Sequence, residues 1–254
     1  MKQIAFITGA TSGIGAATAH RLAQQGFHLI LTGRRKERLE EISTFLKKEY
    51  EIEILTLNLD VRNRFEVETS VANLPDEWKK IQVLVNNAGL AMGLAPIEAG
   101  SIDHWEQMID TNLKGLLYVS RAVLPMMIET GNGHVVNVGS IAGKEAYANG
   151  NVYCATKAAV DSLSKGMRVD LSKYPIRVSA IHPGMVETEF SIVRFEGDAE
   201  RAKTVYQGFE NLLAQDCAEA IWWMISRPAH VNINELTIMP TAQPSATVVH
   251  RKNA

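Results

Sequence analysis

Two cysteines, Cys154 and Cys217, are all that the 254-residue sequence contains. They are too few for a disulfide framework and lack the clustering of a zinc site, so we expect a protein of the reducing cytoplasm. An excess of charge of one sign is also missing, because 26 Lys and Arg stand against 28 Asp and Glu. A nucleic-acid binder would normally carry a basic patch, and we therefore expect no nucleic-acid partner.

Long apolar runs are absent as well. None approaches the roughly 18 to 20 residues of a membrane span, and the apolar start Ile4–Ile7 is too short for a signal peptide, so no membrane partner is expected. The sequence has no linker rich in proline, glycine or serine and no internal repeat, which argues against a second domain. Apolar residues nevertheless make up 46% of the chain and charged residues 21%, enough for a full core. We expect a single domain over residues 1–254.

Short β-rich runs alternate with helical stretches along the chain. Most of these runs are almost continuously apolar, as in parallel strands that helices cover on both faces. The alternation predicts an α/β fold with a doubly wound, seven-stranded parallel sheet of the Rossmann type. The expected strands are Ile4–Thr8, His28–Thr32, Glu53–Leu57, Ile81–Val85, His134–Val138, Ile176–Ile181 and Glu235–Met239. The expected helices are Ile14–Gln25, Arg35–Glu49, Asn63–Asn73, Ile102–Glu129, Asn151–Ser172 and Asp216–Ser226.

The alternation lapses over residues 183–214, between the sixth strand and the last helix. A stretch of this length inside a compact α/β domain is usually functional. We expect a substrate loop there.

A glycine-rich segment, Thr8 to Gly15, follows the first predicted strand and opens the first predicted helix. Glycines let backbone N–H groups approach a pyrophosphate at the positive end of a helix. The spacing is G-x-x-x-G-x-G and not the G-x-G-x-x-G of the standard fingerprint. A plain structural turn is the alternative, but the position in the first βα unit favours a dinucleotide.

The second predicted strand ends in Thr32, Gly33, Arg34 and Arg35, without a carboxylate. An acidic residue here would bond the ribose 2′-hydroxyl of NAD, whereas arginine accommodates the 2′-phosphate of NADP. Both arginines could instead be solvated residues at a helix start. The absence of an acid supports NADP as the cofactor, because a carboxylate would repel the phosphate.

Two further strand ends face the same expected crevice. Asp60 and Val61 follow the third strand, and Asn87, Ala88 and Gly89 follow the fourth. An aspartate there could bond an adenine amino group, and small residues let the backbone approach the ribose.

Ser140 follows the fifth predicted strand, with Tyr153 thirteen positions later and Lys157 four beyond that. Residues i and i+4 share a helix face, so the phenol and the ammonium point the same way. A nearby cation stabilises a phenolate and would lower the tyrosine pKa from about 10 towards neutrality. Tyr-x-x-x-Lys alone also arises by chance as an exposed helix pair, but the preceding serine and the nucleotide loop weaken that reading.

Together with Asn86 to Gly89 and Pro183–Gly184, these motifs resemble the short-chain dehydrogenase/reductases over essentially the whole chain. The resemblance implies that Tyr153 is the general acid–base and that Ser140 holds and polarises the substrate carbonyl. It implies that Lys157 binds the nicotinamide ribose and lowers the Tyr153 pKa.

The resemblance also extends to two other positions. Asn112 matches a fourth catalytic residue that supports a water relay behind the lysine, and Thr188 matches a threonine that bonds the nicotinamide carboxamide. The implied reaction is hydride transfer at the nicotinamide, with the proton passing through the tyrosine. The residues expected to bind NADP(H) are Gly9, Thr11, Ser12, Gly13, Ile14, Gly15, Arg34, Arg35, Asp60, Val61, Asn87, Ala88, Gly89, Tyr153, Lys157, Pro183, Gly184, Val186 and Thr188.

One branch is resembled more closely than the family at large: the NADP-dependent 3-hydroxy acid dehydrogenases, which act on serine, L-allo-threonine and related compounds. The segments that carry this resemblance are 32–39, 59–64, 86–90, 189–198 and 228–234. The branch implies a homotetramer and a small anionic substrate.

A small hydroxy acid needs a cation for its carboxylate. Arg194 falls in the expected substrate loop and has the forked geometry that suits a carboxylate, although a loop arginine is often simply solvated. Tyr147 could add a hydroxyl to the substrate site formed with Ser140 and Tyr153. The seven histidines are dispersed without metal-ligand spacing, so no metal is expected.

The leading hypothesis is therefore an NADP-dependent enzyme that interconverts a short 3-hydroxy acid and its semialdehyde or ketone. The alternatives are a broader carbonyl reductase, including one for sulfonate aldehydes, and a cofactor sensor without chemistry. An intact set of Ser140, Tyr153, Lys157 and Asn112 argues against the sensor, because a pure binder does not need a proton-transfer group.

Overall fold

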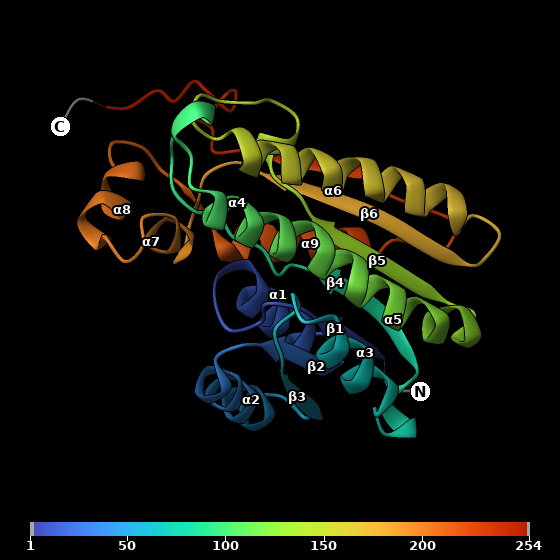
Figure 1. Ribbon diagram of the computed structural model, residues 1–254. Helices are drawn as coiled ribbons and strands as arrows, with labels where there is room; N and C mark the ends of the chain where they lie inside the picture. Colours follow the sequence, from blue (N-terminus) through green and yellow to red (C-terminus); the bar gives the residue numbers. More distant parts are fainter. Residues whose placement is uncertain (1–2, 253–254) are drawn as a thin grey trace.

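The computed structural model describes residues 3–252 and is built around one sheet of seven strands (Figure 1). All neighbouring strands in the sheet are parallel, in the order β3-β2-β1-β4-β5-β6-β9. The strands are β1 (Ile4–Ile7), β2 (His28–Gly33), β3 (Ile54–Asn58), β4 (Ile81–Asn86), β5 (Gly133–Val138), β6 (Ile176–Pro183) and β9 (Glu235–Ile238). The predicted doubly wound Rossmann sheet is thus confirmed, with every strand end within two residues of its expected position.

Nine α-helices connect or flank these strands within the described residues. They are α1 (Gly13–Gln24), α2 (Lys36–Glu49), α3 (Arg64–Ala72), α4 (Ile102–Ile109), α5 (Leu116–Thr130), α6 (Asn151–Asp170), α7 (Phe190–Arg194), α8 (Ala199–Val205) and α9 (Ala214–Ile225). None of the helices in this part of the chain is long and apolar enough to cross a membrane.

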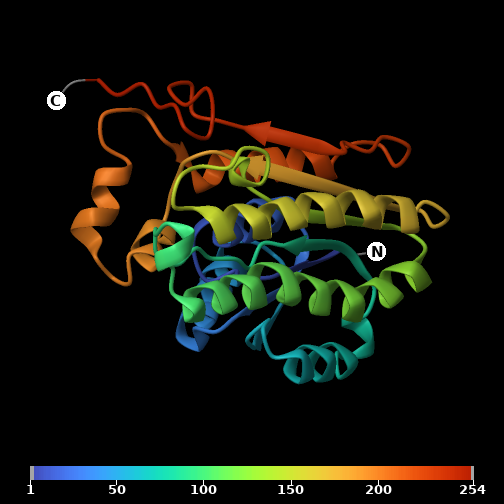
Figure 2. The ribbon, with the colours of Figure 1, turned by 45° about the horizontal axis from the view of Figure 1, so that its top comes forward.

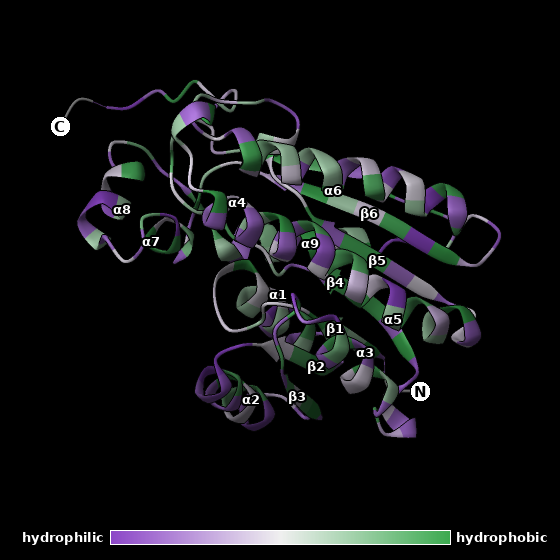
Figure 3. Cartoon of the chain, in the orientation of Figure 1, coloured by the Kyte–Doolittle hydropathy of each residue, from purple (hydrophilic) through white to green (hydrophobic). Residues whose placement is uncertain are grey.

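The strands bury both of their faces, because successive side chains point to opposite sides of the sheet. Ile7 and Leu31 pack with α1, α2 and α9, whereas Phe6 and Ile30 pack with α3 and α5 on the other face. Figure 2 shows the two helical layers with the sheet between them. In Figure 3 the surface helix α2 is largely hydrophilic, whereas the central strands carry the hydrophobic colour. This two-sided burial explains why the strands read as continuous apolar runs.

The strand order reverses direction next to β1, whose neighbours are β2 on one side and β4 on the other. In open α/β sheets, ligands bind outside the carboxyl ends of the strands at such a switch point. The glycine-rich segment leaves β1 at this place, and α1 begins at Gly13.

The expected helix Ile102–Glu129 has the right extent but is not regular. Between α4 and α5 the backbone adopts π-helical geometry over Asp110–Gly115. Thr111 and Asn112 are buried in this segment. A π-turn changes which side chains face inward, and hydrophobic periodicity does not reveal it.

The stretch 183–214, expected as a loop, contains short elements. Strands β7 (Val186–Glu187) and β8 (Leu212–Leu213) pair with each other, outside the main sheet, and α7 and α8 lie between them. Figure 2 shows these two helices extending beyond one end of the sheet, with the C-terminal segment beside them. The backbone N–H of Lys252 donates to the carbonyl of Gly208 at 2.7 Å, which ties the chain end to this stretch.

Candidate active site

A cavity of about 450 Å³ lies at the carboxyl ends of the strands. Its size is typical of a site for a small molecule or cofactor. All residues predicted to hold the cofactor line it except Gly15. Gly15 lies in α1 against Gly9 and Asn87, and a Cβ at this position would collide with the carbonyl oxygen of Gly9. Gly15 therefore packs closely behind the cavity wall and does not line the cavity.

The glycine-rich segment is fastened to the end of β4. The Thr8 hydroxyl accepts from the backbone N–H groups of Asn87 and Ala88 at 3.0 and 2.9 Å, and the Asn87 side chain donates to the Thr8 carbonyl at 2.9 Å. Gly9 has a φ of +64°, and a Cβ there would lie 2.9 Å from the Cα of Ala88. Only glycine fits this left-handed, closely approached position.

The amino end of α1 lines the cavity, where the Ser12 hydroxyl lies beside the Glu189 carboxylate. Ser12, the N-cap residue, makes no capping hydrogen bond with its side chain, and no acidic residue occupies the first turn. The unpaired N–H groups of a helix start favour a negative charge such as a phosphate.

The two arginines after β2 have different surroundings. Arg35 donates from Nη1 to Oε2 of Glu189 at 2.8 Å and from Nη2 to the hydroxyl of Thr11 at 3.1 Å. Arg34 lines the same cavity and makes no hydrogen bond or ion pair within residues 3–252. Its charge acts on the Asp60 carboxylate without a hydrogen bond, so of the two arginines Arg34 has the guanidinium whose donors are not engaged.

Asp60, predicted to reach an adenine amino group, is paired with Arg62. Oδ2 of Asp60 lies 2.6 Å from Nη2 of Arg62, and Oδ1 accepts from the Arg62 backbone N–H at 3.0 Å. Burial works to raise the pKa of Asp60, but the hydrogen bonds from Arg62 outweigh it and lower that pKa, so the group stays ionised. A fixed carboxylate at this place keeps accepting capacity on its oxygens.

The predicted catalytic side chains meet at the far end of the cavity. Ser140 follows β5, its hydroxyl accepts from the backbone N–H of Ala142 at 3.1 Å, and it lies beside the phenol of Tyr153 on α6. Lys157, one turn further along α6, is buried and donates from Nζ to the carbonyl of Val138 at 2.9 Å. Burial lowers the pKa of Lys157 to about 8.

Asn112 lies behind this group and does not line the cavity. Its Oδ1 accepts from the backbone N–H of Leu90 at 2.8 Å, and its Nδ2 donates to the Leu90 carbonyl at 2.8 Å and to the Thr156 hydroxyl at 3.0 Å. The π-helical segment thus presents a side chain that fixes the backbone next to Gly89 and Lys157. A water relay through this residue stays a prediction.

Tyr153 is buried, and burial raises the pKa of its phenol above the ordinary value of about 10. The first charge that opposes this shift is the guanidinium of Arg194. The sequence led us to expect that Lys157 lowers this pKa. In the structure Nζ of Lys157 lies 6.0 Å from the centre of the Tyr153 ring, on the side of Val138, and burial dominates.

Arg194, at the end of α7, meets the other predicted substrate residues. Its Nη2 donates to the Tyr147 hydroxyl at 2.9 Å, and its Cζ lies 5.2 Å from the centre of the Tyr153 ring. Its Nε is buried and has no hydrogen-bond partner among the described residues. These three side chains line a second cavity of about 30 Å³, which shares Tyr153 with the larger one.

The model of the short chain dehydrogenase family matches residues 3–199. This chain belongs to that family. The expected resemblance is thereby confirmed, and the strand order and the placement of the motifs agree with it.

Individual short-chain dehydrogenases are similar over almost the whole length. The NADP-dependent 3-hydroxy acid dehydrogenase of Escherichia coli (strain K12) is 50% identical over 251 residues, 98% of this chain and all of that protein. Sulfoacetaldehyde reductase 2 of Chromohalobacter salexigens is 45% identical over 253 residues, 99% of this chain and all of that protein. A solved structure, the closed form of serine dehydrogenase complexed with NADP+, superposes with a TM-score of 0.92 at 50% identity, covering 98% of this chain and all of that one.

Two contacts of this short-chain dehydrogenase were not predicted from the sequence. The ring of Phe190 lies 5.6 Å from that of Tyr153, and Glu189 forms an ion pair with Arg35. Both residues belong to the substrate stretch and contact partners more than thirty positions away. Their own sequence neighbourhood carries no physical pattern that reveals such contacts.

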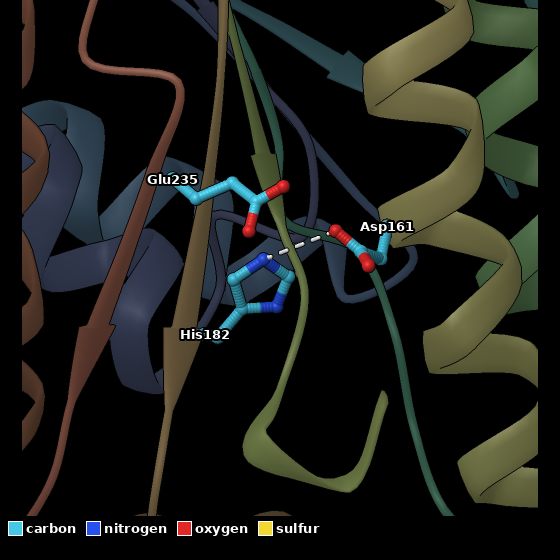
Figure 4. Close-up of side chains that lie close together, drawn as sticks. All are labelled: Asp161, His182 and Glu235. Atoms are coloured by element: carbon cyan, nitrogen blue, oxygen red, sulfur yellow. Dashed lines mark ion pairs between the residues drawn. The ribbon is translucent and has the colours of Figure 1, made fainter. Parts of the chain in front are cut away.

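The fold of this short-chain dehydrogenase also assembles a charged cluster behind Ser140. Ligand atoms of Asp161, His182 and Glu235, from α6, β6 and β9, lie within 4.8 Å of one another, as metal ligands would (Figure 4). Nζ of Lys144, however, lies 2.8 Å from Oδ1 of Asp161 and 2.6 Å from Oε2 of Glu235, and Lys165 contacts both carboxylates. An ammonium already sits where a metal cation would bind, so the residues favour an ion-pair cluster. That no metal is bound remains the prediction.

We expect Lys144→Met to lower the free energy of unfolding at neutral pH by about 1–3 kcal/mol, because it leaves the largely buried Asp161 without its nearest cation. Hydrogen bonds from Lys144 lower the pKa of Glu235, and those from Lys144 and Lys165 lower that of Asp161 although burial opposes this. A carboxyl group whose pKa is lower in the folded than in the unfolded protein stabilises the fold at pH values above its unfolded-state pKa. This stabilisation is lost as the pH falls through the folded-state pKa. Thermal or denaturant unfolding across the acid range measures the difference from wild type, which should shrink towards the lowest pH.

Lys165→Met serves as the matched control, because Lys165 contacts the same carboxylates from a more exposed position. It should cost less than about 1 kcal/mol. Equal destabilisation by both variants would contradict the importance assigned to Lys144.

Proposed function

We propose that this short-chain dehydrogenase catalyses the NADP-dependent interconversion of a short 3-hydroxy acid and its semialdehyde or ketone. The observation that carries this proposal is the juxtaposition of the Arg194 guanidinium, with its unpaired buried Nε, the Tyr147 hydroxyl and the Tyr153 ring. A compound with a carboxylate two bonds away from a carbinol carbon offers an anion to the arginine and a hydroxyl to the tyrosine. Relatives named for 3-hydroxy acids and for serine support the same substrate class.

The cofactor is NADP(H), which supplies the hydride acceptor or donor when bound. The fit is supported by the unpaired guanidinium of Arg34, by the absence of a carboxylate at the end of β2, and by the open amino end of α1. Arg34 would receive the 2′-phosphate, while Arg35 holds the cavity wall through Thr11 and Glu189. The remaining predicted cofactor residues would surround the nucleotide along the cavity.

Tyr153 would take the proton of the substrate hydroxyl in oxidation and return it in reduction. Ser140, which lies beside the Tyr153 phenol, would hold and polarise the substrate oxygen. The buried ammonium of Lys157 would bind the nicotinamide ribose, held in place by the carbonyl of Val138. Asn112 would position the backbone that faces this lysine, with a relay water as its further role.

Reduction of a sulfonate aldehyde is the second candidate. A sulfonate is also a compact anion for Arg194, and a relative at 45% identity is named sulfoacetaldehyde reductase 2. A broad carbonyl reductase would need no cation beside Tyr153, and a sensor would need no proton-transfer group.

A panel of alcohols oxidised with NADP+ separates these candidates. It comprises serine, L-allo-threonine, 3-hydroxypropionate and 3-hydroxyisobutyrate, the sulfonate 2-hydroxyethanesulfonate, and 1-propanol as the uncharged member. We expect kcat/KM for the best carboxylate to exceed that for 1-propanol by about 100-fold or more, because an ion pair removed from water ordinarily contributes a factor of this size to binding. Equal rates on charged and uncharged alcohols would support the broad reductase, and preference for the sulfonate would support the second candidate.

Arg194→Ala should raise KM for carboxylated substrates by about 10- to 100-fold and change KM for uncharged alcohols little, because it removes a carboxylate partner. Steady-state kinetics of 3-hydroxypropionate and 1-propanol with the wild type and the variant measure this. Tyr147→Phe is the control, since it removes the hydroxyl bonded to Arg194 and keeps the cation. An equal loss on both substrates would refute the carboxylate role.

We also propose a homotetramer in the cytoplasm. The assembly is supported by apolar side chains that α4, α5 and α6 leave exposed, namely Ile102, Leu117 and Val169. Light scattering measures the assembly state. Both cysteines are free and buried, which agrees with a reducing compartment.

A further inference from the structure

The guanidinium of Arg194, proposed to bind the carboxylate of the substrate, lies beside Tyr153, proposed to move the proton. Its Cζ lies 4.9 Å from the ring centre of Phe190, 5.2 Å from that of Tyr153 and 5.9 Å from that of Tyr147. Lys157, which has the other nearby ammonium, is further from Tyr153 at 6.0 Å. Arg194 is thus the nearest cation to the Tyr153 ring.

The groups that face Tyr153 come from four parts of the chain. Lys157 and the thiol of Cys154 lie on its own helix, Arg194 on α7, the Tyr147 phenol on the preceding loop and the Ser140 hydroxyl at the end of β5. His104 also lines the small cavity, and its Nε2 lies 3.3 Å from Oε1 of Glu196. Neither Lys157 nor Arg194 has an acidic partner within the described residues, but Nζ of Lys157 donates to the Val138 carbonyl, whereas Nε of Arg194 is buried without a hydrogen-bond partner there.

We propose that the carboxylate of the substrate, by pairing with Arg194, sets the protonation state in which Tyr153 works, so that charged and uncharged substrates are turned over with different pH dependence. This inference rests on the proposed function and deepens it. In addition to contacting the carboxylate, Arg194 acts here through Tyr153, and in this second role it is a positioning residue.

The physical basis is the loss of one neighbouring charge. An unpaired guanidinium stabilises the phenolate of Tyr153. When a carboxylate neutralises it, the phenolate loses that support and Tyr153 holds its proton to a higher pH. For two charges about 6 Å apart in a partly buried site the change is on the order of one pH unit.

The sign follows from the direction of the reaction. Oxidation needs the deprotonated phenol, so its rate falls below the Tyr153 pKa and the acidic limb moves to higher pH with a hydroxy acid. Reduction needs the protonated phenol, so a charged aldehyde keeps its rate to a higher pH than an uncharged one. The coupling therefore favours reduction of carboxylated aldehydes in alkaline solution.

The test compares 3-hydroxypropionate with 3-hydroxypropionamide, which has nearly the same shape and no charge. With saturating NADP+, the pH profile of kcat/KM reports the pKa values of the enzyme–NADP+ complex before the hydroxy acid or amide binds. The pH profile of the single-turnover rate constant at saturating substrate, called kcat here, reports the pKa values of the complete complex. For the acid we expect the acidic limb of kcat to lie about one pH unit above that of kcat/KM. For the amide the two limbs should coincide.

Arg194→Lys should preserve the shift, because it keeps the charge, and Arg194→Gln should abolish it. Coincident limbs for the acid in the wild type would overturn the coupling, whether or not the amide is turned over. If the acid and the amide have the same KM, the carboxylate site of the proposed function fails. If their KM values differ and the limbs of the acid still coincide, only the coupling fails.

Discussion

Tyr153→Phe should lower kcat by about 10²- to 10⁴-fold, the range that a positioned acid–base group contributes. The phenol lies beside the Ser140 hydroxyl, and the centre of the Tyr153 ring lies 6.0 Å from Nζ of Lys157 and 5.2 Å from Cζ of Arg194. The ring itself packs against Phe190 and remains in the variant. NADPH affinity, measured by cofactor fluorescence, should therefore stay within about twofold of wild type, since uniform binding is retained.

Tyr147→Phe is the matched control, because it removes a phenol from the same cluster without removing the one that moves the proton. It should retain most of kcat. Full turnover in Tyr153→Phe, or equal losses in the two variants, would contradict the assignment of Tyr153 as the acid–base group.

The second large effect concerns the cofactor. Arg34→Asp should lower the ratio of kcat/KM with NADP+ to that with NAD+ by about 100-fold or more, because it replaces a charge-assisted bond to a dianionic phosphate by repulsion. The new carboxylate can also accept from the ribose hydroxyl of NAD. Steady-state kinetics with both cofactors at one ionic strength measure the ratio.

Arg35→Ala provides the comparison. Arg35 is already engaged by Glu189 and Thr11, so its loss should change the ratio less than the loss of Arg34. A larger effect at Arg35, or an unchanged ratio in Arg34→Asp, would show that the 2′-phosphate is recognised by other groups.

The sheet could be predicted because its information is local. Each strand is a short apolar run buried on both faces, and the glycine-rich segment with its positive φ at Gly9 and Gly13 has a fixed place after β1. Tyr153 and Lys157 could be placed on one face because helical spacing fixes their relation.

Other features depend on contacts between distant residues. The Arg35–Glu189 pair joins positions 154 residues apart, and the cluster of Lys144, Asp161 and Glu235 draws on three separate elements. The π-helical geometry around Asn112 accompanies a hydrogen bond with Leu90, and a 3.6-residue hydrophobic period does not predict it. The seven dispersed histidines likewise gave no hint that His182 would come to lie beside Asp161.

We propose above all that the site oxidises a short 3-hydroxy acid with NADP+. The most direct measurement mixes purified protein with NADP+ and each of the four hydroxy acids of the panel, and follows NADPH by its near-ultraviolet absorbance together with the carbonyl product. We expect NADPH and product in equal amounts for at least one acid, at a rate that the Tyr153→Phe protein does not reach. No NADPH from any of the four acids, with turnover of uncharged carbonyl compounds, would contradict it.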